Sequence, residues 1–410
     1  MTAAAVGSVM QWYDFAVYSY MAPVVSQLFF PSDDPLDSLI ATFGVFAAGF
    51  LAGPVGAVFF GHVGDKVGRK PMLIISIVMM GLATAAIGLL PVESSVGWLA
   101  GAGLVVCRLL QGFASSGEYG GSVAFIAEHS PPSRRGFTTS FVLIGSNIGF
   151  LAGAGVAAVV TDLFSDDTLD SWAWRVPFLL GGLVALGGLV LRNGLREPPL
   201  PPDYEPPLET PIKVALRYNW REMLQVFGLV LTVNAGYYLV FVYVLSYLTN
   251  VVDFDGREAV DINTFAIVLM CFLPLGSALL SDRIGRKPVL YIGNLAVLVL
   301  TVPLFIMIDS AEFVPVLVAQ TVFAVIFSWL YGAGTAAQIE VAPRAVRATV
   351  MIVPSNLANA TFIGTMPLVA AYLVNRTGND LAPAFYLMAM SVVTLLAVRA
   401  TREMAGKPLD

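Results

Sequence analysis

Twelve long apolar segments, joined by short polar stretches, set the strongest limit on what this chain can fold into. An α-helix rises about 1.5 Å per residue, so about 20 apolar residues cross the hydrocarbon core of a membrane. The chain is 57% hydrophobic and 12% charged, whereas a soluble protein typically carries about 25% charged residues. The sequence therefore predicts an all-α membrane protein with twelve transmembrane helices. These are expected at about 3–29, 38–60, 72–90, 96–128, 137–161, 173–191, 222–250, 261–281, 289–308, 312–340, 346–374 and 381–399.

Two polar motifs occur once in each half of the chain, in the same order. The sequence DKVGRKP at 65–71 recurs as DRIGRKP at 282–288, and the Glu and Arg at positions 128 and 135 recur at 340 and 347. Parallel internal repeats of this kind are typical of transporters that have two six-helix halves. We therefore expect two pseudo-symmetric six-helix bundles. The expected division is an N-terminal bundle at 1–191, a cytoplasmic proline-rich linker at 192–220 and a C-terminal bundle at 221–410.

Basic residues concentrate in the junctions on one side of the expected membrane. With the N-terminus inside, the junctions after even-numbered helices and the C-terminal end hold 18 of the 22 Lys and Arg residues, Arg192 among them. An excess of basic residues marks the cytoplasmic side of a membrane protein. The expected location is the cytoplasmic (inner) membrane of a bacterium, with multiple spans and both termini in the cytoplasm. The linker is expected to be extended, because it is rich in proline.

Three charged residues lie well inside the expected spans, away from the span ends, namely Asp14, Arg108 and Glu118. A charge at membrane depth costs about 2.5–3.5 kcal/mol on insertion scales, so it usually faces a bundle interior or a water-filled path. A desolvated carboxylate can exchange a proton near neutral pH, and an arginine offers a planar fork to a carboxylate. We therefore expect Asp14 or Glu118 to couple protons and Arg108 to bind a substrate carboxylate. The alternative is a permanent ion pair between Arg108 and one of these acids.

Polar and aromatic side chains on other expected spans extend this candidate site. Asn234, Tyr237 and Tyr238 share one helical face, and an aromatic cluster can also hold a quaternary ammonium group by cation–π attraction. Aromatic stripes also pack helices or lie at membrane interfaces, and polar groups also join helices, so both interpretations stay open. The expected substrate-binding residues are Arg108, Gln111, Tyr119, Tyr18, Trp12, Asn234, Tyr237, Tyr238, Tyr331 and Asn356.

Five stretches of the chain resemble a known transporter family. GHVGDKVGRK at 61–70 and RLLQG at 108–112 are similar to signatures of the major facilitator superfamily. QWYDF at 11–15, SGEYGG at 116–121 and WAWRVPF at 172–178 resemble the metabolite:proton symporter family within it. That family includes carriers of proline and betaine, citrate, 2-oxoglutarate and shikimate. The resemblance implies proton-coupled transport by rocking of two helical bundles.

The resemblance also implies a cytoplasmic latch, in which charge pairs hold one conformation and break in the other. The alternative is that these charges only set the orientation of the chain in the membrane. The residues expected to act in gating are Asp65, Arg69, Glu128, Arg135, Asp282, Arg286, Glu340 and Arg347.

These residues together favour a symporter that imports a small carboxylate-bearing metabolite with a proton. A di- or tricarboxylic acid is preferred over proline or betaine, because no extra acid in the C-terminal half accompanies Arg108. A uniporter, a proton antiporter or exporter, and a transport-dead membrane sensor are the alternatives. The chain has no convergent nucleophile, base or metal set, so we do not expect an enzyme. We also expect no metal, no cofactor besides the coupling proton, no nucleic-acid partner, and a monomer in the lipid bilayer.

Overall fold

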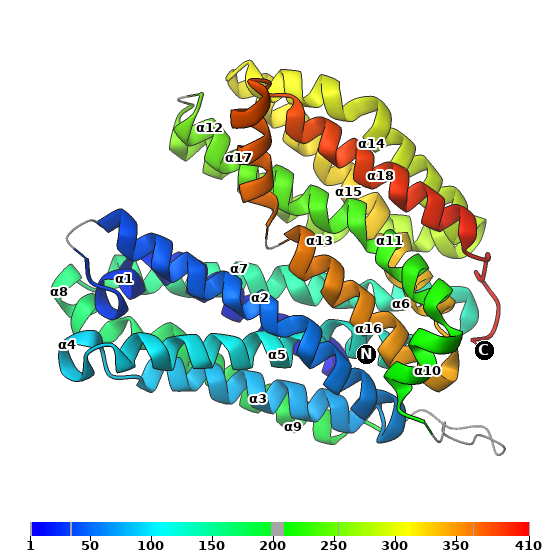
Figure 1. Ribbon diagram of the computed structural model, residues 1–410, viewed down its shortest axis with the longest axis horizontal. Helices are drawn as coiled ribbons and strands as arrows, with labels where there is room; N and C mark the ends of the chain where they lie inside the picture. The colour runs from blue at the N-terminus through cyan, green and yellow to red at the C-terminus, as the bar shows by residue number, and fades with distance from the viewer. Residues whose placement is uncertain (1, 33–34, 198–208, 253, 364, 410) are drawn as a thin grey trace. The chain divides into compact units, whose positions relative to one another are not determined.

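The computed structural model describes residues 2–32, 35–197, 209–252, 254–363 and 365–409, and most of these residues are helical (Figure 1). Ten helices in this part of the chain are long and apolar enough to cross a membrane. The all-α membrane fold that the sequence predicts is therefore confirmed.

Two of the twelve expected spans are not among these ten helices of the described residues. The helix α1 (Thr2–Phe29) is long, but polar side chains and tyrosines along it lower its mean hydropathy. In the expected span at 346–374, residue 364 lies outside the described residues, and the remainder is described as α16 (Arg347–Ala358), the π-helical turn Asn359–Ile363 and α17 (Met366–Thr377).

The first compact unit consists of residues 1–126 and 144–212. Within it α3 packs on α9, and α1 packs on both α2 and α9. The buried rings of Phe29, Trp174 and Phe178 lie in its apolar core. Its helices are α1, α2 (Pro35–Lys66), α3 (Arg69–Leu89), α4 (Glu93–Val96), α5 (Leu99–Glu128), α7 (Phe141–Leu163), α8 (Asp166–Thr168), the π-helical turn Leu169–Ala173 and α9 (Arg175–Asn193).

The second compact unit consists of residues 127–143 and 213–410. Its longest helices pack as neighbours, α13 against α15, α14 against α15 and α18, and α11 against α16 and α18. The short helix α6 packs on α13 and α15. Its helices are α6 (Arg135–Thr139), α10 (Pro211–Tyr218), α11 (Trp220–Tyr238), the π-helical turn Leu239–Tyr243, α12 (Val244–Asn250), α13 (Gly256–Ile284), α14 (Arg286–Asp309), α15 (Phe313–Val341), α16, α17 and α18 (Ala382–Ala400), with single 3₁₀ turns at Pro132–Arg134 and Arg344–Val346.

The segment expected as an extended linker is partly helical. Residue Arg192 lies in the last turn of α9, and residues 211–218 form α10. The side chain of Ala215 is fully buried and packs with Val226 of α11, which gives α10 an apolar support that sequence reasoning overlooked. Residues 198–208 of the linker lie outside the described residues. The division into bundles at 191 and 221 stays a prediction.

A close approach of two helix backbones in the first unit depends on Gly112. A Cβ atom at this position would overlap the carbonyl oxygen of Gly49, so α5 and α2 meet backbone to backbone. Small residues permit this contact between membrane helices.

We therefore expect Gly112→Ala to destabilise the protein, because overpacking a close contact costs about 1–3 kcal/mol. The loss should be visible as a lower apparent melting temperature of the purified protein in detergent. The matched control is Gly155→Ala on α7, where a new Cβ would meet no atom within 4 Å. Equal losses in both variants would contradict the assignment of a tight contact to Gly112.

Candidate functional site

A buried ion pair joins α1 and α5 in the first unit. The Nη1 atom of Arg108 donates to Asp14 Oδ2 at 2.9 Å and to Gln111 Oε1 at 2.8 Å. Both charged side chains are 1% exposed. The other carboxylate oxygen of Asp14 accepts from Thr84 Oγ1 at 2.9 Å and from Gln111 Nε2 at 2.5 Å. Side chains of α3 and α5 thus converge on the Asp14 carboxylate of α1, and both of its oxygens accept hydrogen bonds.

Aromatic rings of α1 enclose the Arg108 guanidinium. Its central carbon lies 4.0 Å from the ring centre of Tyr18 and 5.9 Å from that of Phe15. The Tyr18 hydroxyl donates to the carbonyl oxygen of Thr42 at 3.0 Å, which fixes the ring. A desolvated guanidinium is attracted to the face of an aromatic ring. The structure therefore brings together Asp14, Tyr18, Arg108 and Gln111, as predicted, and adds Thr84, which sequence reasoning missed.

The second buried acid, Glu118, pairs with an arginine that the sequence placed elsewhere. Both side chains of the Glu118–Arg192 ion pair are fully buried. Oε2 of Glu118 accepts from Arg192 Nη1 and from Ser76 Oγ, each at 2.8 Å, and Oε1 accepts from Arg192 Nη2 and from Ser122 Oγ. Arg192 also donates to the carbonyl oxygen of Leu73. The pair thus connects α3, α5 and α9.

This arrangement bears on two expectations. Arg192 was counted among the charges of the cytoplasmic junctions, yet its side chain is fully buried at the end of α9. The alternative of an ion pair between Arg108 and one of the two acids is realised with Asp14 and not with Glu118. The arrangement also depends on Gly7 of α1, where a Cβ atom would overlap both Glu118 and Arg192. Burial of two opposite charges in contact avoids an uncompensated charge in a low-dielectric interior.

Two further predicted residues of the first unit lie half-buried. The Trp12 ring makes edge-to-face contacts with Phe15 and Phe150, with ring centres 5.8 and 6.5 Å apart. Tyr119 lies on α5, one residue after Glu118. The structure places Trp12 among packing aromatics, so its role in substrate binding stays a prediction, as does that of Tyr119.

The predicted residues of the second unit form a polar group around Asn234. Its Nδ2 donates to Asn359 Oδ1 at 2.7 Å, and the Tyr331 hydroxyl donates to its Oδ1 at 3.4 Å. The rings of Tyr237 and Tyr238 are in edge contact, with centres 5.6 Å apart. Asn356 donates to the carbonyl oxygen of Ile352 within its own helix. Asn359 is therefore a direct partner of Asn234.

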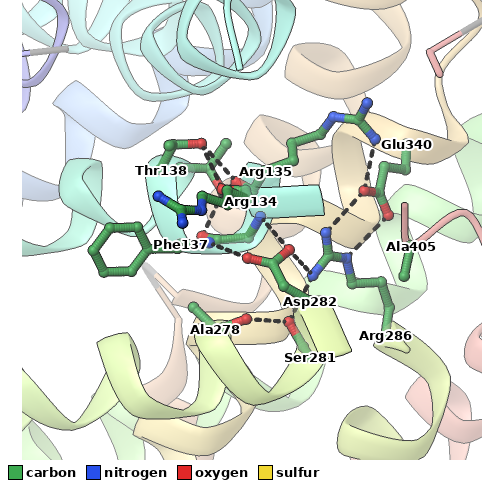
Figure 2. Close-up of polar contacts among 12 residues, drawn as sticks. Arg134, Arg135, Phe137, Thr138, Ala278, Ser281, Asp282, Arg286, Glu340 and Ala405 are labelled. Carbon is green, nitrogen blue, oxygen red and sulfur yellow. Dashed lines mark hydrogen bonds and ion pairs between the residues drawn. The ribbon is translucent and has the colours of Figure 1, made fainter. Parts of the chain in front are cut away.

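The repeated charged motifs form a connected network in the second unit (Figure 2). Arg135 donates to Glu340 at 2.9 Å, and Arg286 donates to both carboxylate oxygens of Glu340 at 3.1 and 3.2 Å. Arg286 also lies 2.7 Å from Asp282, whose two oxygens accept from the backbone amides of Gly136 and Phe137. Four of the residues predicted for gating thus lie in one cluster that joins α6, α13, α14 and α15.

The other four predicted gating residues form two separate ion pairs. In the first unit Arg69 lies 2.9 Å from Asp65, and in the second unit Arg347 lies 3.0 Å from Glu128. All eight residues are therefore engaged with acids or arginines of the same set, as a latch requires. The structure describes the contacts, and the gating role itself stays a prediction.

Two glutamates that sequence reasoning missed bind helix starts, one in each unit. Glu197 accepts from the backbone amides of Arg69 and Lys70 at 3.2 and 2.8 Å, and Glu403 accepts from those of Arg286 and Lys287, both at 2.9 Å. A carboxylate at a helix N-terminus accepts from backbone amides that have no partner within the helix. Its negative charge also interacts favourably with the positive end of the helix dipole. Burial alone would raise the pKa of Glu403, but the amides that donate to it hold this pKa below its usual range.

The C-terminal segment takes part in the same network. The Nη2 atom of Arg135 donates to the backbone carbonyl of Lys407 at 3.0 Å.

The glycines that precede the two capped helices have left-handed backbones, with φ of 132° at Gly68 and 103° at Gly285. A side chain at either glycine would be strained and would also meet the capping glutamate.

Comparisons with known proteins give relatives across the whole chain. Residues 4–358 match the model of the Major Facilitator Superfamily. The chain is 36% identical to the glycine betaine/proline/ectoine/pipecolic acid transporter OusA of Dickeya dadantii and 34% identical to the proline/betaine transporter of Escherichia coli. In both comparisons all of this chain aligns with 84% of the relative. These relatives are transporters and not enzymes, as expected for this chain.

Solved structures agree on the fold. The proton:xylose symporter XylE bound to 6-bromo-6-deoxy-D-glucose has a TM-score of 0.75 at 18% sequence identity, over 100% of this chain and 96% of that one. FucP in the outward conformation has a TM-score of 0.73 at 14% identity, over 98% and 99%. The chain therefore belongs to the Major Facilitator Superfamily, as its motifs indicated, and is a multi-pass membrane protein related to the proline/betaine transporters.

Proposed function

We propose that this protein is a proton-coupled symporter that imports a small zwitterion of the proline and betaine class. The buried Asp14–Arg108 pair is the observation that carries this proposal. The names of the relatives favour a zwitterion and do not favour the di- or tricarboxylic acid that the sequence suggested. A zwitterion also suits the charge of the site, because one arginine balanced by one acid has no surplus charge for a multivalent anion.

In the proposed coupling step, the substrate carboxylate and Asp14 compete for the same guanidinium. When the substrate binds to Arg108, Asp14 loses its cationic partner in a nonpolar surrounding. A carboxylate that loses its counter-charge under such conditions is better neutralised by a proton. Substrate and proton therefore bind together, and the return of Asp14 to Arg108 releases both. No other coupling ion or cofactor is invoked.

We assign the coupling proton to Asp14 and a structural role to Glu118. The carboxylate of Glu118 accepts from Arg192, Ser76 and Ser122, and both members of its ion pair are fully buried. This pair lies apart from Arg108, so a substrate carboxylate at Arg108 has no means of displacing it. Of the two candidate proton carriers, this difference favours Asp14.

We propose that the polar and aromatic residues of the second unit are suited to bind an ammonium group. Tyr237, Tyr238 and Tyr331 offer ring faces for cation–π attraction, and Asn234 lies within hydrogen-bond distance of Tyr331. We further propose that the charged latch gates alternating access, that the protein works as a monomer, and that both termini face the cytoplasm of a bacterial inner membrane.

Uptake by the purified full chain in liposomes tests the proposal. Radiolabelled proline, glycine betaine and citrate are supplied outside, with and without an inwardly directed proton gradient. We expect accumulation of proline or betaine only with the gradient, together with acidification of the vesicle interior. Equal uptake with and without the gradient, and no proton movement, would overturn symport. Selective uptake of citrate would restore the di- or tricarboxylic acid as substrate.

A further inference from the structure

The short helix α10 carries charged side chains on the face opposite to its packed face. Ala215 is fully buried, where it packs with Val226 of α11 and with Ala342 and Val346 of the same unit. At 100° per residue, Lys213, Leu216 and Arg217 lie within a 100° arc on the other side, and all three are exposed. The helix is therefore amphipathic, and its outer face combines two basic residues with one leucine.

The chain changes direction after α10 and enters a membrane span. Figure 1 shows α10 turning away from the axis of α11, and Asn219 between them has φ of −124° and ψ of 24°. The span Trp220–Thr249 begins directly at this turn. The side chain of Trp220 is 49% exposed and that of Leu224, one turn later, is 59% exposed. The start of the span thus presents a tryptophan and a leucine outward.

A third basic residue, Arg221, is exposed at the same turn. None of Lys213, Arg217 and Arg221 forms an ion pair within the part of the chain that the structure describes. The flanking acids Glu209 and Glu222 leave the stretch with a net charge of +1. Three basic side chains therefore gather beside an apolar surface that the membrane covers.

We propose that Lys213, Arg217 and Arg221 bind the anionic headgroup of a phospholipid in the adjoining leaflet. A tryptophan at the start of a span is typical of the membrane–water interface, so Trp220 sets the level at which the headgroups lie. A basic amphipathic helix at that level attracts acidic lipids. Leu216 and Leu224 would contact the acyl chains of the same lipid. The proposal does not depend on the identity of the transported substrate.

Lipid-dependent thermal stability of the purified protein in detergent tests this inference. Phosphatidylglycerol and phosphatidylcholine with the same acyl chains are titrated separately, and a bound ligand raises the apparent melting temperature. We expect phosphatidylglycerol to stabilise the wild type more strongly than phosphatidylcholine. The triple variant Lys213→Gln, Arg217→Gln, Arg221→Gln should bind phosphatidylglycerol with an apparent affinity about 100-fold lower, since each basic side chain contributes about fivefold.

The matched control removes the same charge from other exposed positions, as Arg196→Gln, Arg399→Gln, Arg402→Gln. This control should keep the full response to phosphatidylglycerol, and the single variant Arg217→Gln should give an intermediate one. Equal responses to both lipids, an unchanged response in the triple variant, or an equal loss in the control would each overturn the inference. Inorganic phosphate that stabilises the wild type as well as the lipid does would also overturn it.

Discussion

Asp14→Asn is expected to abolish proton-driven accumulation of substrate while leaving substrate exchange intact. Asparagine has the shape of a protonated aspartate and can still accept from Thr84 and Gln111, but it releases Arg108 from its ion pair. The substrate carboxylate then binds Arg108 without any accompanying proton. In liposomes, the internal substrate concentration should not rise above the external one, even under a proton gradient. Substrate binding should also lose its dependence on pH.

Replacement of the other partner should have a different signature. Arg108→Gln removes the fork for the substrate carboxylate, and a hydrogen bond to a charged group contributes about 1.5–3 kcal/mol, so affinity should fall by about 10- to 100-fold.

The matched control for Asp14→Asn is Asp166→Asn, which changes an exposed acid. Continued proton-coupled accumulation by Asp14→Asn would reject Asp14 as the proton carrier.

The second large effect is expected at the Glu118–Arg192 pair. Arg192→Met leaves the Glu118 carboxylate buried without its cation, and breaking a buried ion pair from one side costs about 3–5 kcal/mol. Glu118→Gln leaves the buried Arg192 cation without its acid and should lower the stability of the protein by a similar amount. The loss should appear as a lower melting temperature and a smaller monodisperse fraction in detergent.

The double variant Glu118→Gln, Arg192→Met should recover most of this loss. It removes both charges, and the neutral glutamine can still meet Ser76 and Ser122. The control Arg196→Met changes an exposed arginine four residues later and should have little effect. If the two single losses add in the double variant, the two side chains are not coupled. Proton-coupled uptake by the double variant would separate the structural role of this pair from the coupling role of Asp14.

Sequence reasoning found the charged centre of the first unit because a charge inside an apolar span needs a partner. Asp14 and Arg108 stand out in their segments for that reason, and Gln111 follows one helical turn after Arg108. The partner of Glu118 could not be found in this way. A helical wheel gives angles within one helix but not the neighbouring helix, and Arg192 at the end of a span resembles an ordinary cytoplasmic charge.

Other residues were missed because their sequence signal is weak. Thr84 and Ser76 are small polar residues in a long apolar helix, and such residues often bond only to their own backbone. Glu197 and Glu403 accept from backbone amides, which every helix start offers, so no particular residue pattern indicates them. The helix α10 follows a run of prolines, and that composition hid the short amphipathic pattern. The omitted polar residues thus reflect tertiary contacts, whereas α10 was hidden by the local composition before it.

The cap at Glu403 has a practical consequence for protein fusions. The carboxylate that completes the start of α14 lies only three residues after the last transmembrane helix, and the carbonyl of Lys407 meets Arg135 a few residues later. An affinity tag or fluorescent protein joined in place of residues 403–409 would remove both contacts. A reporter attached beyond Leu409 through a flexible linker keeps them, and this is the design suited to expression and fluorescence assays.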